Sequence, residues 1–422
     1  MKIAFETLGC KLNQAESELL ARQFSGAGYE VVTTGEPTDI YVLNTCTVTS
    51  TADAKSRQLL RQAQRNNPES IVIVTGCYAQ RVPEEISGIE GVSLVAGNGD
   101  KTRLLSLIDD AGFFSPQSYY MKSIPAKGTA IFRTRSFVKI QDGCTSFCSY
   151  CIVPFVRGSE KSQSAELILS NIKKLVSEGI NEVVLTGTEI GAYDYEGINL
   201  TALIERILSE TTVPRLRLSS LQPQEISPQL VNLWQDERLC PHFHLSLQSG
   251  SDSVLKRMKR LYTTAGYSEA VAMIRKVLPE AAITTDIIAG FPGESEEEFE
   301  ESLDFCRKTG FSRIHVFSYS PRPGTEAEKM TPRVPDSIKT QRNQKLRVLG
   351  KECITNYAGQ FLNRSMDVLW EQQSNSIWSG YTANYIKIYA RSARDLTNRI
   401  VPATLVKLYK GDGVWGEIEE NV

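Results

Sequence analysis

The chain has 422 residues, of which 41% are hydrophobic and 23% charged, and its formal net charge at pH 7 is −2. This length suffices for two or three domains with their own cores, and the composition excludes a wholly disordered chain. Because the net charge is slightly negative, a global positive field for nucleic acid is also excluded, and any such contact must use local patches.

The first residues and the cysteine content bear on the cellular compartment. The opening segment is too short and polar for a secretory signal peptide, and no apolar stretch reaches membrane-spanning length. Nine cysteines without a secretion signal favour a reducing compartment and metal ligation over disulfides. We therefore expect an intracellular, cytoplasmic protein with no membrane contact.

Three strand-like runs in the N-terminal third each lead into a cysteine. Residues 2–9 precede Cys10, residues 39–45 precede Cys46, and residues 70–76 precede Cys77. Helix-like stretches, residues 14–27 and 52–65, separate the runs. The runs are nearly continuous in apolar, often β-branched residues, as in strands buried on both faces, so the alternation predicts a doubly wound parallel sheet.

The three cysteines of this third are expected to converge. The C-terminal ends of parallel strands share one edge of a sheet, where ligands bind, so Cys10, Cys46 and Cys77 would meet there. The alternative is three ordinary buried thiols, which are common in cores. Each cysteine stands just past a strand, where the chain turns toward solvent, and this position favours a three-cysteine iron–sulfur site with one open iron.

The segment from residue 137 to 321 repeats a strand–loop–helix pattern. The candidate strands are residues 137–141, 182–186, 215–219, 242–247, 283–289 and 313–320. Helix-like segments between them are residues 165–178, 200–210, 264–278 and 296–308. Six β/α units predict an open, partial barrel with its chemistry at the C-terminal ends of the strands.

A second cysteine set follows the first strand of this segment. The run Asp142-Gly-Cys-Thr-Ser-Phe-Cys-Ser-Tyr-Cys contains Cys144, Cys148 and Cys151. Three thiolates on a short loop can hold three irons of a [4Fe–4S] cube, and no fourth cysteine follows at ferredoxin spacing. An open iron predicts chemistry at the cluster rather than electron relay. A catalytic zinc site is the alternative, and the odd count and crowded spacing argue against a disulfide.

Further polar loops are predicted at the same barrel edge. They contain Gly187 after the second strand, Gln248 after the fourth, Asp286 within the fifth and Gly290 after it. Glycine lets a backbone approach a ligand closely, so these loops favour a small-molecule cofactor beside the open cluster.

Other residues of this segment allow a metal or a structural interpretation. His242 and His244 could be ligands, but alternate residues of a strand share a face and can line a barrel core. Cys240, Cys306 and Cys353 have no partner spacing. We expect these three to be ordinary buried thiols.

The C-terminal segment begins with a Lys/Arg-rich helix-like stretch, residues 336–357, and continues with short alternating strands. The strands are residues 365–370, 377–380, 385–390, 404–410 and 414–418. Such a series predicts a small antiparallel β-barrel of the oligonucleotide-binding type. Lys387 with Tyr389, and Lys407 with Tyr409, place cations beside aromatic planes. This pairing suits base stacking and phosphate contact, and a generic polar outer face is the alternative.

A basic helix face lies near the N-terminal cysteines. Arg57 and Arg61 share one face of the stretch 52–65, which follows Cys46. We expect this face to contact RNA, although a solvated helix face is the commoner explanation of such a run.

The motifs together resemble a known family. Cys144-Thr-Ser-Phe-Cys148-Ser-Tyr150-Cys151 is similar to the radical S-adenosylmethionine (SAM) signature, in which the aromatic residue before the last cysteine contacts adenine. The runs Phe-Val-Lys-Ile-Gln-Asp-Gly-Cys144, Cys151-Ile-Val-Pro-Phe-Val-Arg-Gly158, Leu-Ser-Leu-Gln248-Ser-Gly, Asp286-Ile-Ile-Ala-Gly-Phe-Pro-Gly-Glu294 and Phe317-Ser-Tyr-Ser-Pro-Arg-Pro-Gly-Thr325 closely resemble the radical SAM methylthiotransferase family.

The resemblance covers essentially the whole chain and implies its organisation. It implies an α/β protein with a methylthiotransferase N-terminal domain (residues 1–118), a radical SAM domain with a partial (β/α)6 barrel (130–357) and a TRAM RNA-binding barrel (358–420). The trio Cys10, Cys46 and Cys77 would hold the family's auxiliary [4Fe–4S] cluster, and Cys144, Cys148 and Cys151 its radical SAM [4Fe–4S] cluster. The implied contacts of the cofactor are Tyr150, Gly187, Gln248, Asp286 and Gly290.

The resemblance also implies the chemistry and the partners. SAM would be cleaved at the Cys144 cluster to give a deoxyadenosyl radical, and would also methylate sulfur held at the auxiliary cluster. The partners would be the anticodon stem-loop of tRNA, contacted through Arg57, Arg61, Lys387, Tyr389, Lys407 and Tyr409, and an external electron donor of the flavodoxin or ferredoxin kind.

The sequences around the three N-terminal cysteines resemble one branch of this family most. Thr7-Leu-Gly-Cys10-Lys-Leu-Asn, Asn44-Thr-Cys46-Thr-Val-Thr and Thr75-Gly-Cys77-Tyr-Ala-Gln look most like the MtaB branch, which methylthiolates C2 of N6-threonylcarbamoyladenosine at tRNA position 37, beside the anticodon. Glu189 departs from relatives that often carry an uncharged residue or histidine there. The alternatives are methylthiation of isopentenyladenosine in tRNA or of a ribosomal-protein aspartate, and a noncatalytic RNA-binding iron–sulfur sensor.

Overall fold

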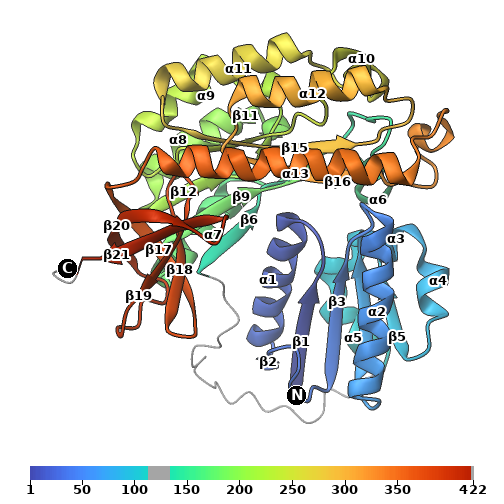
Figure 1. The fold of residues 1–422 in the computed structure, drawn as a ribbon. Helices are drawn as coiled ribbons and strands as arrows, with labels where there is room; N and C mark the ends of the chain where they lie inside the picture. The colour runs from blue at the N-terminus through green and yellow to red at the C-terminus, as the bar shows by residue number, and fades with distance from the viewer. Residues whose placement is uncertain (113–133, 420–422) are drawn as a thin grey trace.

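The N-terminal domain is built on a five-stranded parallel sheet (Figure 1). The computed structural model describes residues 1–112 and 134–419. The strands are β1 (Lys2–Thr7), β2 (Glu30–Val32), β3 (Ile40–Thr45), β4 (Ile71–Gly76) and β5 (Val92–Ala96), in the order β2-β1-β3-β4-β5. Every neighbouring pair is parallel.

Helices cover both faces of this sheet, which confirms the doubly wound prediction. The helices are α1 (Lys11–Gly26), α2 (Ser50–Asn66), α3 (Cys77–Arg81), α4 (Pro83–Ser87), the 3₁₀ turn η1 (Asn98–Arg103) and α5 (Leu104–Asp110). Val42 of β3 packs with Phe24 of α1 on one face. The next residue, Leu43, packs with Leu60 of α2 on the other face. Successive strand side chains point to opposite faces, so the apolar run of β3 fills two cores.

The central domain is an open arc of parallel strands. They are β6 (Arg135–Lys139), β9 (Glu182–Thr186), β12 (Arg215–Leu218), β14 (His242–Leu245), β15 (Ala282–Ala289) and β16 (Arg313–Ser318). The short β13 (Ser220–Leu221) follows β12 and pairs with β14, which joins the two halves of the arc. Among the described strands, β6 and β16 do not pair with each other. The partial (β/α)6 barrel is therefore confirmed.

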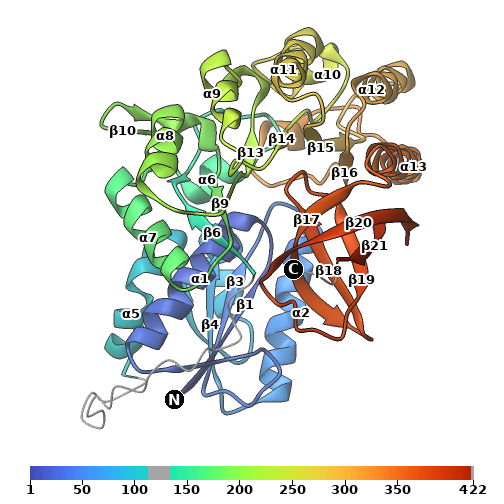
Figure 2. The same cartoon turned by 90° about the vertical axis from the view of Figure 1, so that its left-hand side faces the viewer.

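Helices form the outer layer of the arc (Figures 1 and 2). They are α7 (Ala165–Ser177), α8 (Leu200–Glu210), α9 (Pro228–Asn232), α10 (Asp252–Arg257), α11 (Thr264–Val277), α12 (Glu296–Thr309) and α13 (Asp336–Gly359). Short elements in the loops are β7 (Gln141–Asp142), α6 (Val153–Arg157), β8 (Lys161–Ser162), β10 (Asp194–Tyr195) and β11 (Ile198–Asn199), with the 3₁₀ turns η3 (Ile190–Ala192), η4 (Pro223–Glu225), η5 (Leu233–Gln235) and η6 (Glu326–Lys329).

Local sequence signals set the ends of these helices. Ser295 and Glu298 form a capping box at the start of α12, because each side chain accepts a hydrogen bond from the other's backbone N–H. Gly310 ends the same helix with φ at 64°, the left-handed conformation that glycine adopts without a steric penalty.

The C-terminal domain is a closed five-stranded barrel. Its strands are β17 (Ser365–Ser374), β18 (Ile377–Thr382), β19 (Lys387–Arg391), β20 (Ile400–Tyr409) and β21 (Gly413–Ile418), closed in the order β17-β18-β19-β21-β20. The prediction of an antiparallel barrel holds for every pair except β19 and β21, which are parallel. An odd number of strands cannot alternate in direction around a closed ring, so one parallel pair is unavoidable.

One residue of the C-terminal domain enters the bottom of the central barrel. Tyr385 lies between β18 and β19 with φ at 68°. Its ring stacks on His242 of β14 at a centroid distance of 4.6 Å, and the guanidinium of Arg217 lies 4.7 Å from the ring centre. Arg135 donates a hydrogen bond of 3.1 Å to its hydroxyl. The small barrel is thereby fixed to the N-terminal ends of the central strands.

The predictions of domain boundaries and of membrane-spanning segments can be compared with the structure. The domain boundaries at residues 118, 130 and 420 lie outside the described residues, and α13 ends at Gly359, next to the boundary expected at 358. None of the described helices combines the length and the apolar character needed to cross a membrane.

Candidate functional site

The first candidate site lies at one edge of the N-terminal sheet. Cys10 directly precedes α1, Cys46 directly follows β3, and Cys77 opens α3 just past β4. The strands β1, β3 and β4 are neighbours, so the three cysteines share the edge formed by their C-terminal ends. All three thiols are free; Cys46 and Cys77 are buried and Cys10 is exposed. This is the location that the strand–helix alternation predicts, and iron ligation stays a prediction.

Two glycines bring these loops into contact. Gly9 has φ at +101°, and a Cβ built on it would stand 2.8 Å from the Cys46 sulfur. Gly76 has φ at +100°, and a Cβ there would stand 2.4 Å from the carbonyl oxygen of Thr45. Only glycine combines this conformation with so close an approach. The residues immediately before Cys10 and Cys77 therefore press against the Cys46 loop.

Hydrogen bonds fasten the three loops together. The side-chain amide of Asn13 donates to the carbonyls of Leu8 and Thr45 at 2.8 and 2.9 Å. The Thr45 hydroxyl donates to the carbonyl of Thr75 at 2.5 Å. These bonds connect the segments before Cys10, before Cys46 and before Cys77, so the backbone of the site is fixed without any bound group.

The electrostatics suit thiols that bind a metal. Burial raises the pKa of Cys46 to about 12, and the charges of Cys10 and Cys77 also act to raise it. A thiol with the pKa of Cys46 keeps its proton at neutral pH until a metal cation replaces it. Three sulfur donors on fixed loops fit the soft ligand set that iron–sulfur clusters use.

The second candidate site is the loop that follows β7. Its middle is anchored to the segment after α10, because Ser149 donates to the carbonyls of Met258 and Arg257 at 3.1 and 2.8 Å. The amide of Cys151 donates to the carbonyl of Cys148 at 2.9 Å, and the amide of Cys144 donates to Gly158 at 3.1 Å. The three cysteines are partly exposed residues, and their loop lies at the C-terminal end of the barrel.

Three polar side chains from distant loops surround these sulfurs. Arg260 donates to the Cys148 sulfur at 3.1 Å and to the Gln222 oxygen at 2.7 Å. Gln222 in turn bonds to Glu189, whose carboxylate accepts from the Cys144 thiol at 3.0 Å. Sequence reasoning singled out Glu189 only as a departure from relatives, and it missed Arg260 and Gln222, which carry no local motif.

The carboxylates near Cys144 change its acidity. Burial and the hydrogen bond to Glu189 together raise the pKa of Cys144 to about 11. Ligand atoms of Cys144, Glu160 and Glu189 all lie within 4.8 Å of one another. Behind them, burial raises the pKa of Glu225 to about 7, and the Glu189 charge acts in the same direction. A cation at these sulfurs would relieve the repulsion between the carboxylates.

Two of the predicted cofactor contacts lie next to the cysteine loop. Tyr150 packs among apolar side chains that include Phe291 and Tyr319. Burial raises the pKa of its hydroxyl well above the usual value. A Cβ on Gly187 would stand 2.8 Å from the carbonyl of Gln141, so the loop after β9 runs directly along β7.

The other three predicted contacts lie around β15. Gln248 has φ at 69°, and its backbone N–H donates to the carbonyl of Asp286 at 2.8 Å. The Asp286 carboxylate is 3.3 Å from the imidazole of His244. Gly290 has φ at +76°, and its N–H donates to the Glu294 carboxylate at 2.7 Å. These residues line the barrel interior and its upper edge, and their contact with a cofactor stays a prediction.

The two histidines of β14 are hydrogen-bonded inside the barrel. His244 bonds to the Thr284 hydroxyl at 2.9 Å, and the same hydroxyl lies 3.2 Å from His242. Burial lowers the pKa of His242 well below its usual value, so that ring stays neutral. This arrangement supports the core-lining interpretation. Cys240, Cys306 and Cys353 are buried free thiols, as expected.

The basic helix face near the N-terminal cysteines is partly engaged within the protein. Arg57 donates to the Tyr78 hydroxyl at 2.6 Å and pairs with Glu85 at 3.4 Å. Arg61 is exposed on the same helix. Only Arg61 of this pair thus lies fully at the surface.

The aromatic and cationic residues of the small barrel are also unequally exposed. Lys387 pairs with Asp412 at 3.1 Å, and Tyr389 is only 7% exposed, with its hydroxyl bonded to the same carboxylate. Tyr409 packs edge-on against Tyr389, and Lys407 is exposed. A register shift between Leu405 and Lys407 interrupts the alternation that the sequence pattern suggests.

Cys77 of the N-terminal domain packs against residues that follow Cys151 in the central domain. Cys77, Ile152 and Val156 form one buried cluster, and Ile152 directly follows Cys151 in the chain. The Asn98 amide lies 3.6 Å from the Cys77 sulfur and donates to the carbonyl of Val156 at 2.8 Å. Helix α3, which begins at Cys77, therefore packs against α6, which begins two residues after Cys151.

Comparison with known proteins identifies the family. Residues 2–97 match the uncharacterized protein family UPF0004, and residues 138–306 match the radical SAM superfamily. The chain is 37% identical to the threonylcarbamoyladenosine tRNA methylthiotransferase MtaB of Bacillus subtilis, over 96% of this chain and 94% of that protein. It is 38% identical to the MtaB of Aquifex aeolicus, over 92% of this chain and 96% of that protein. The chain belongs to the MtaB-type radical SAM methylthiotransferase family.

Other similarities place this methylthiotransferase among its relatives. It is 34% identical to a tRNA-2-methylthio-N(6)-dimethylallyladenosine synthase of Moorella thermoacetica, over 97% of this chain and 98% of that protein. Among solved structures, the radical SAM methyltransferase TsrM of Kitasatospora setae matches with a TM-score of 0.58 at 14% identity, over 78% of this chain and 77% of that chain. This second likeness shows a shared fold. As a radical SAM enzyme, the methylthiotransferase uses SAM and a [4Fe–4S] cluster.

Proposed function

We propose that this enzyme adds a methylthio group to C2 of N6-threonylcarbamoyladenosine beside the anticodon of tRNA, using two [4Fe–4S] clusters. The observation that supports the proposal is that two three-cysteine sets occur in one chain, and that Cys77 of the first set packs against Ile152, which directly follows Cys151 of the second. Cys144, Cys148 and Cys151 would hold the radical SAM cluster, and Cys10, Cys46 and Cys77 the auxiliary one. Each set supplies three sulfur ligands and leaves one iron of a [4Fe–4S] cube for another ligand.

The chemistry explains why a cofactor is needed. C2 of adenine carries an unactivated aromatic C–H bond that protein acids and bases cannot break. When bound, the radical SAM cluster supplies the electron that cleaves SAM, and the resulting radical chemistry acts on that bond. The donor set fits this group, because the thiols are free and hydrogen bonds hold the backbone of their loops.

The protein side chains have three separate tasks. Arg260 donates to the Cys148 sulfur, and such hydrogen bonds stabilise a reduced cluster. Tyr150, with Phe291 and Tyr319 behind it, would form an apolar wall for the adenine of SAM and exclude water. The glycine loops at Gly187 and Gly290 and the backbone of Gln248 would bring main-chain groups close to SAM, with Asp286 behind them.

The choice of nucleoside rests on the relatives. Identity is 37% and 38% to two MtaB enzymes and 34% to a relative named for dimethylallyladenosine, so the threonylcarbamoyl branch is favoured. A tRNA substrate would place the enzyme in the cytoplasm. SAM would serve both as methyl donor and as radical source, and a flavodoxin-like or ferredoxin-like protein would supply electrons.

The anticodon stem-loop would bind through the basic residues of two domains. Arg61 and Lys407 are exposed and can meet phosphates directly. Arg57 and Lys387 would have to exchange Glu85 and Asp412 for phosphate oxygens. Tyr409 is accessible enough to contact a base, while the buried Tyr389 would support it from below.

Nucleoside mass spectrometry on tRNA from cells with and without the gene tests the proposal. We expect the methylthio form to disappear in the deletion strain and threonylcarbamoyladenosine to accumulate. Selective loss of methylthiolated isopentenyladenosine would contradict the choice of nucleoside. An unchanged profile, with the purified enzyme active on ribosomal protein instead, would overturn the tRNA substrate. Absence of deoxyadenosine from the anaerobic enzyme would favour a noncatalytic sensor.

A further inference from the structure

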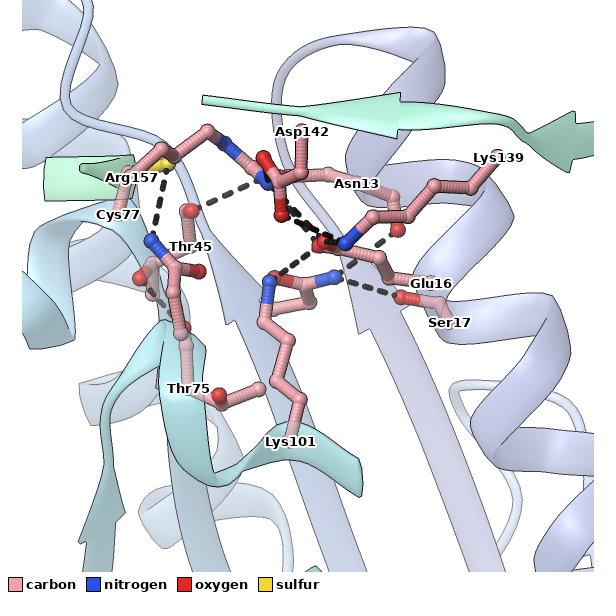
Figure 3. A network of polar contacts seen from close by, with 12 residues as sticks. Asn13, Glu16, Ser17, Thr45, Thr75, Cys77, Lys101, Lys139, Asp142 and Arg157 are labelled. Carbon is pink, nitrogen blue, oxygen red and sulfur yellow. Dashed lines mark hydrogen bonds and ion pairs between the residues drawn. The ribbon is translucent and has the colours of Figure 1, made fainter. Parts of the chain in front are cut away.

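Arg157, the last residue of α6, is almost completely buried between two domains (Figure 3). Only 3% of its side chain is exposed. Its guanidinium donates to Asn13 at 2.6 Å, to Glu16 at 3.0 Å and to Asp142 at 2.8 Å. Asn13 and Glu16 belong to α1 of the N-terminal domain, whereas Asp142 belongs to β7 of the central domain. One planar cation therefore joins both domains with fixed geometry.

The partners of Arg157 lead directly to both cysteine sets. Helix α6 begins two residues after Cys151, and Asp142 stands two residues before Cys144. On the other side, the Asn13 side chain accepts from Arg157 and donates to the loop carbonyls that precede Cys10 and Cys46. A short series of covalent and hydrogen bonds thus runs from one set to the other through a single guanidinium.

Counted with every group ionised, the network around Arg157 holds one more cation than acids. Its acids are Glu16 and Asp142, and its cations are Lys101, Lys139 and Arg157. Burial lowers the pKa of Lys101, whereas the charges of Glu16 and Cys77 act to raise it. Burial acts to lower the pKa of Arg157, but the charges of Cys77, Glu16 and Asp142 raise it well above the usual value. The guanidinium therefore stays protonated, and the Cys77 sulfur lies within its field. A net positive charge in this network can balance the negative charge of thiolates at the edge of the sheet.

From these contacts we propose that Arg157 is a positioning residue, which sets the separation of the two clusters and places positive charge beside the auxiliary one. The inference rests on the proposed two-cluster function. A cluster held by three thiolates becomes more negative on reduction, so a buried cation nearby favours its reduced form and raises its potential. A fixed separation keeps the radical source and the sulfur donor within reach of one substrate base.

Two substitutions separate the two parts of the proposal. Arg157→Gln removes both the charge and the paired donors, whereas Arg157→Lys keeps the charge and loses the planar fork. Asn13→Ala removes the partner that leads to the Cys10 and Cys46 loops and leaves every charge in place. Arg206→Gln is the matched control, because Arg206 also pairs with two carboxylates but lies at the surface of α8, away from either set.

The measurements use the full chain, reconstituted anaerobically with iron and sulfide. The potential of the auxiliary cluster is read in a Cys144→Ala/Cys148→Ala/Cys151→Ala background, where its spectrum is isolated. The spin–spin broadening between the reduced clusters is read by electron paramagnetic resonance in the otherwise unaltered chain. The third readout is methylthio product formed per deoxyadenosine released, with threonylcarbamoyl-containing tRNA as substrate.

We expect a distinct result for each variant. Arg157→Gln shifts the auxiliary potential to more negative values, weakens the broadening and lowers product per deoxyadenosine at least tenfold. Arg157→Lys restores the potential but neither the broadening nor the product yield. Asn13→Ala behaves like Arg157→Lys, and Arg206→Gln behaves like the unaltered enzyme.

Three outcomes would overturn the inference. One is unaltered broadening and yield in iron-loaded Arg157→Gln, and another is full rescue of the yield by Arg157→Lys. If Arg157→Gln fails to bind iron, unaltered broadening in Asn13→Ala and Arg157→Lys would equally contradict it. Failure of the proposed function is recognised separately, because the unaltered enzyme would then hold only one cluster or form no methylthio product.

Discussion

Gly9 and Cys46 touch: a side-chain carbon on Gly9 would stand 2.8 Å from the Cys46 sulfur. Gly9→Ala should therefore displace Cys46 or Cys10, and reconstituted iron should fall from about eight to about four atoms per chain. Iron analysis with visible spectroscopy measures the change. Gly28→Ala is the matched control, since Gly28 also has a positive φ, at +91°, and a Cβ there would have nothing within 4 Å. Equal iron loss in both variants would show that backbone strain, not contact with Cys46, is responsible.

The two cysteine sets should fail in different ways. Cys148→Ser removes one proposed ligand of the radical SAM cluster, so deoxyadenosine formation should fall at least a hundredfold. Cys46→Ser removes one proposed ligand of the auxiliary cluster, so deoxyadenosine should persist while methylthio product is lost. Chromatography of the anaerobic reaction mixture with dithionite quantifies both compounds. Deoxyadenosine release by Cys148→Ser at the unaltered rate would contradict the assignment of the radical SAM site.

Glu182 and Arg217 form a fully buried ion pair at the bottom of the central barrel. Their contacts are 2.7 and 3.1 Å, and the side chains are 0% and 1% exposed. Glu182→Gln leaves an uncompensated cation and should lower the free energy of unfolding by about 3–5 kcal/mol. Urea unfolding at pH 7 measures the loss. Glu166→Gln, which breaks an exposed pair with Arg206, should lower the free energy of unfolding far less.

The same pair predicts how stability depends on pH. Burial acts to raise the pKa of Glu182, but Arg217, together with Arg135 and Arg215, outweighs burial and holds this pKa below the usual 4.5. The folded pKa is thus below the unfolded one, so the stabilisation is present above that unfolded value and is lost as the pH falls through the folded value. Unfolding free energies measured between neutral and acidic pH should decline less steeply in Glu182→Gln. A parallel decline in both proteins would contradict this contribution.

Trp370 is the largest fully buried side chain of the small barrel. It has no exposed surface, and its indole N–H donates to the carbonyl of Val401 at 3.1 Å. Trp370→Ala should lower the free energy of unfolding by about 3–5 kcal/mol, because both packing and the hydrogen bond are lost. Trp370→Phe should cost less, since most of the packing remains. Trp415, which is only half-buried, provides the control substitution Trp415→Phe.

Much of the fold can be predicted from local patterns in the amino-acid sequence. The strands β3, β4, β9 and β15 have largely apolar and β-branched sequences, and the predicted limits of the six central strands and of β1, β3 and β4 agree closely with the structure. The edge strand β2, with three residues, and the strand β5 lack such a signal and were missed. The parallel pair β19 and β21 follows from ring closure, which is a property of the whole barrel and not of either strand.

The candidate site, like the fold, could be predicted only in part from the sequence. The cysteines are identifiable because their spacing and their place after strands are local properties. Arg260 is not, because it is 112 residues from Cys148 in the chain and only the folded barrel brings them together. The pairing of Lys387 with Tyr389 predicts that the Tyr389 ring lies at the surface. In the structure, Asp412 and Tyr409 cover this ring.

Tyr385 gives the small C-terminal barrel a structural role in the central domain. Because its ring lies against His242 and beside Arg217, the small barrel closes the N-terminal end of the central barrel. Exchange of the C-terminal barrel for that of a related enzyme would therefore also remove this closure. A working chimera needs the tyrosine loop together with the arginines that contact it. The two domains look separable in sequence, but they can be exchanged only as a matched pair.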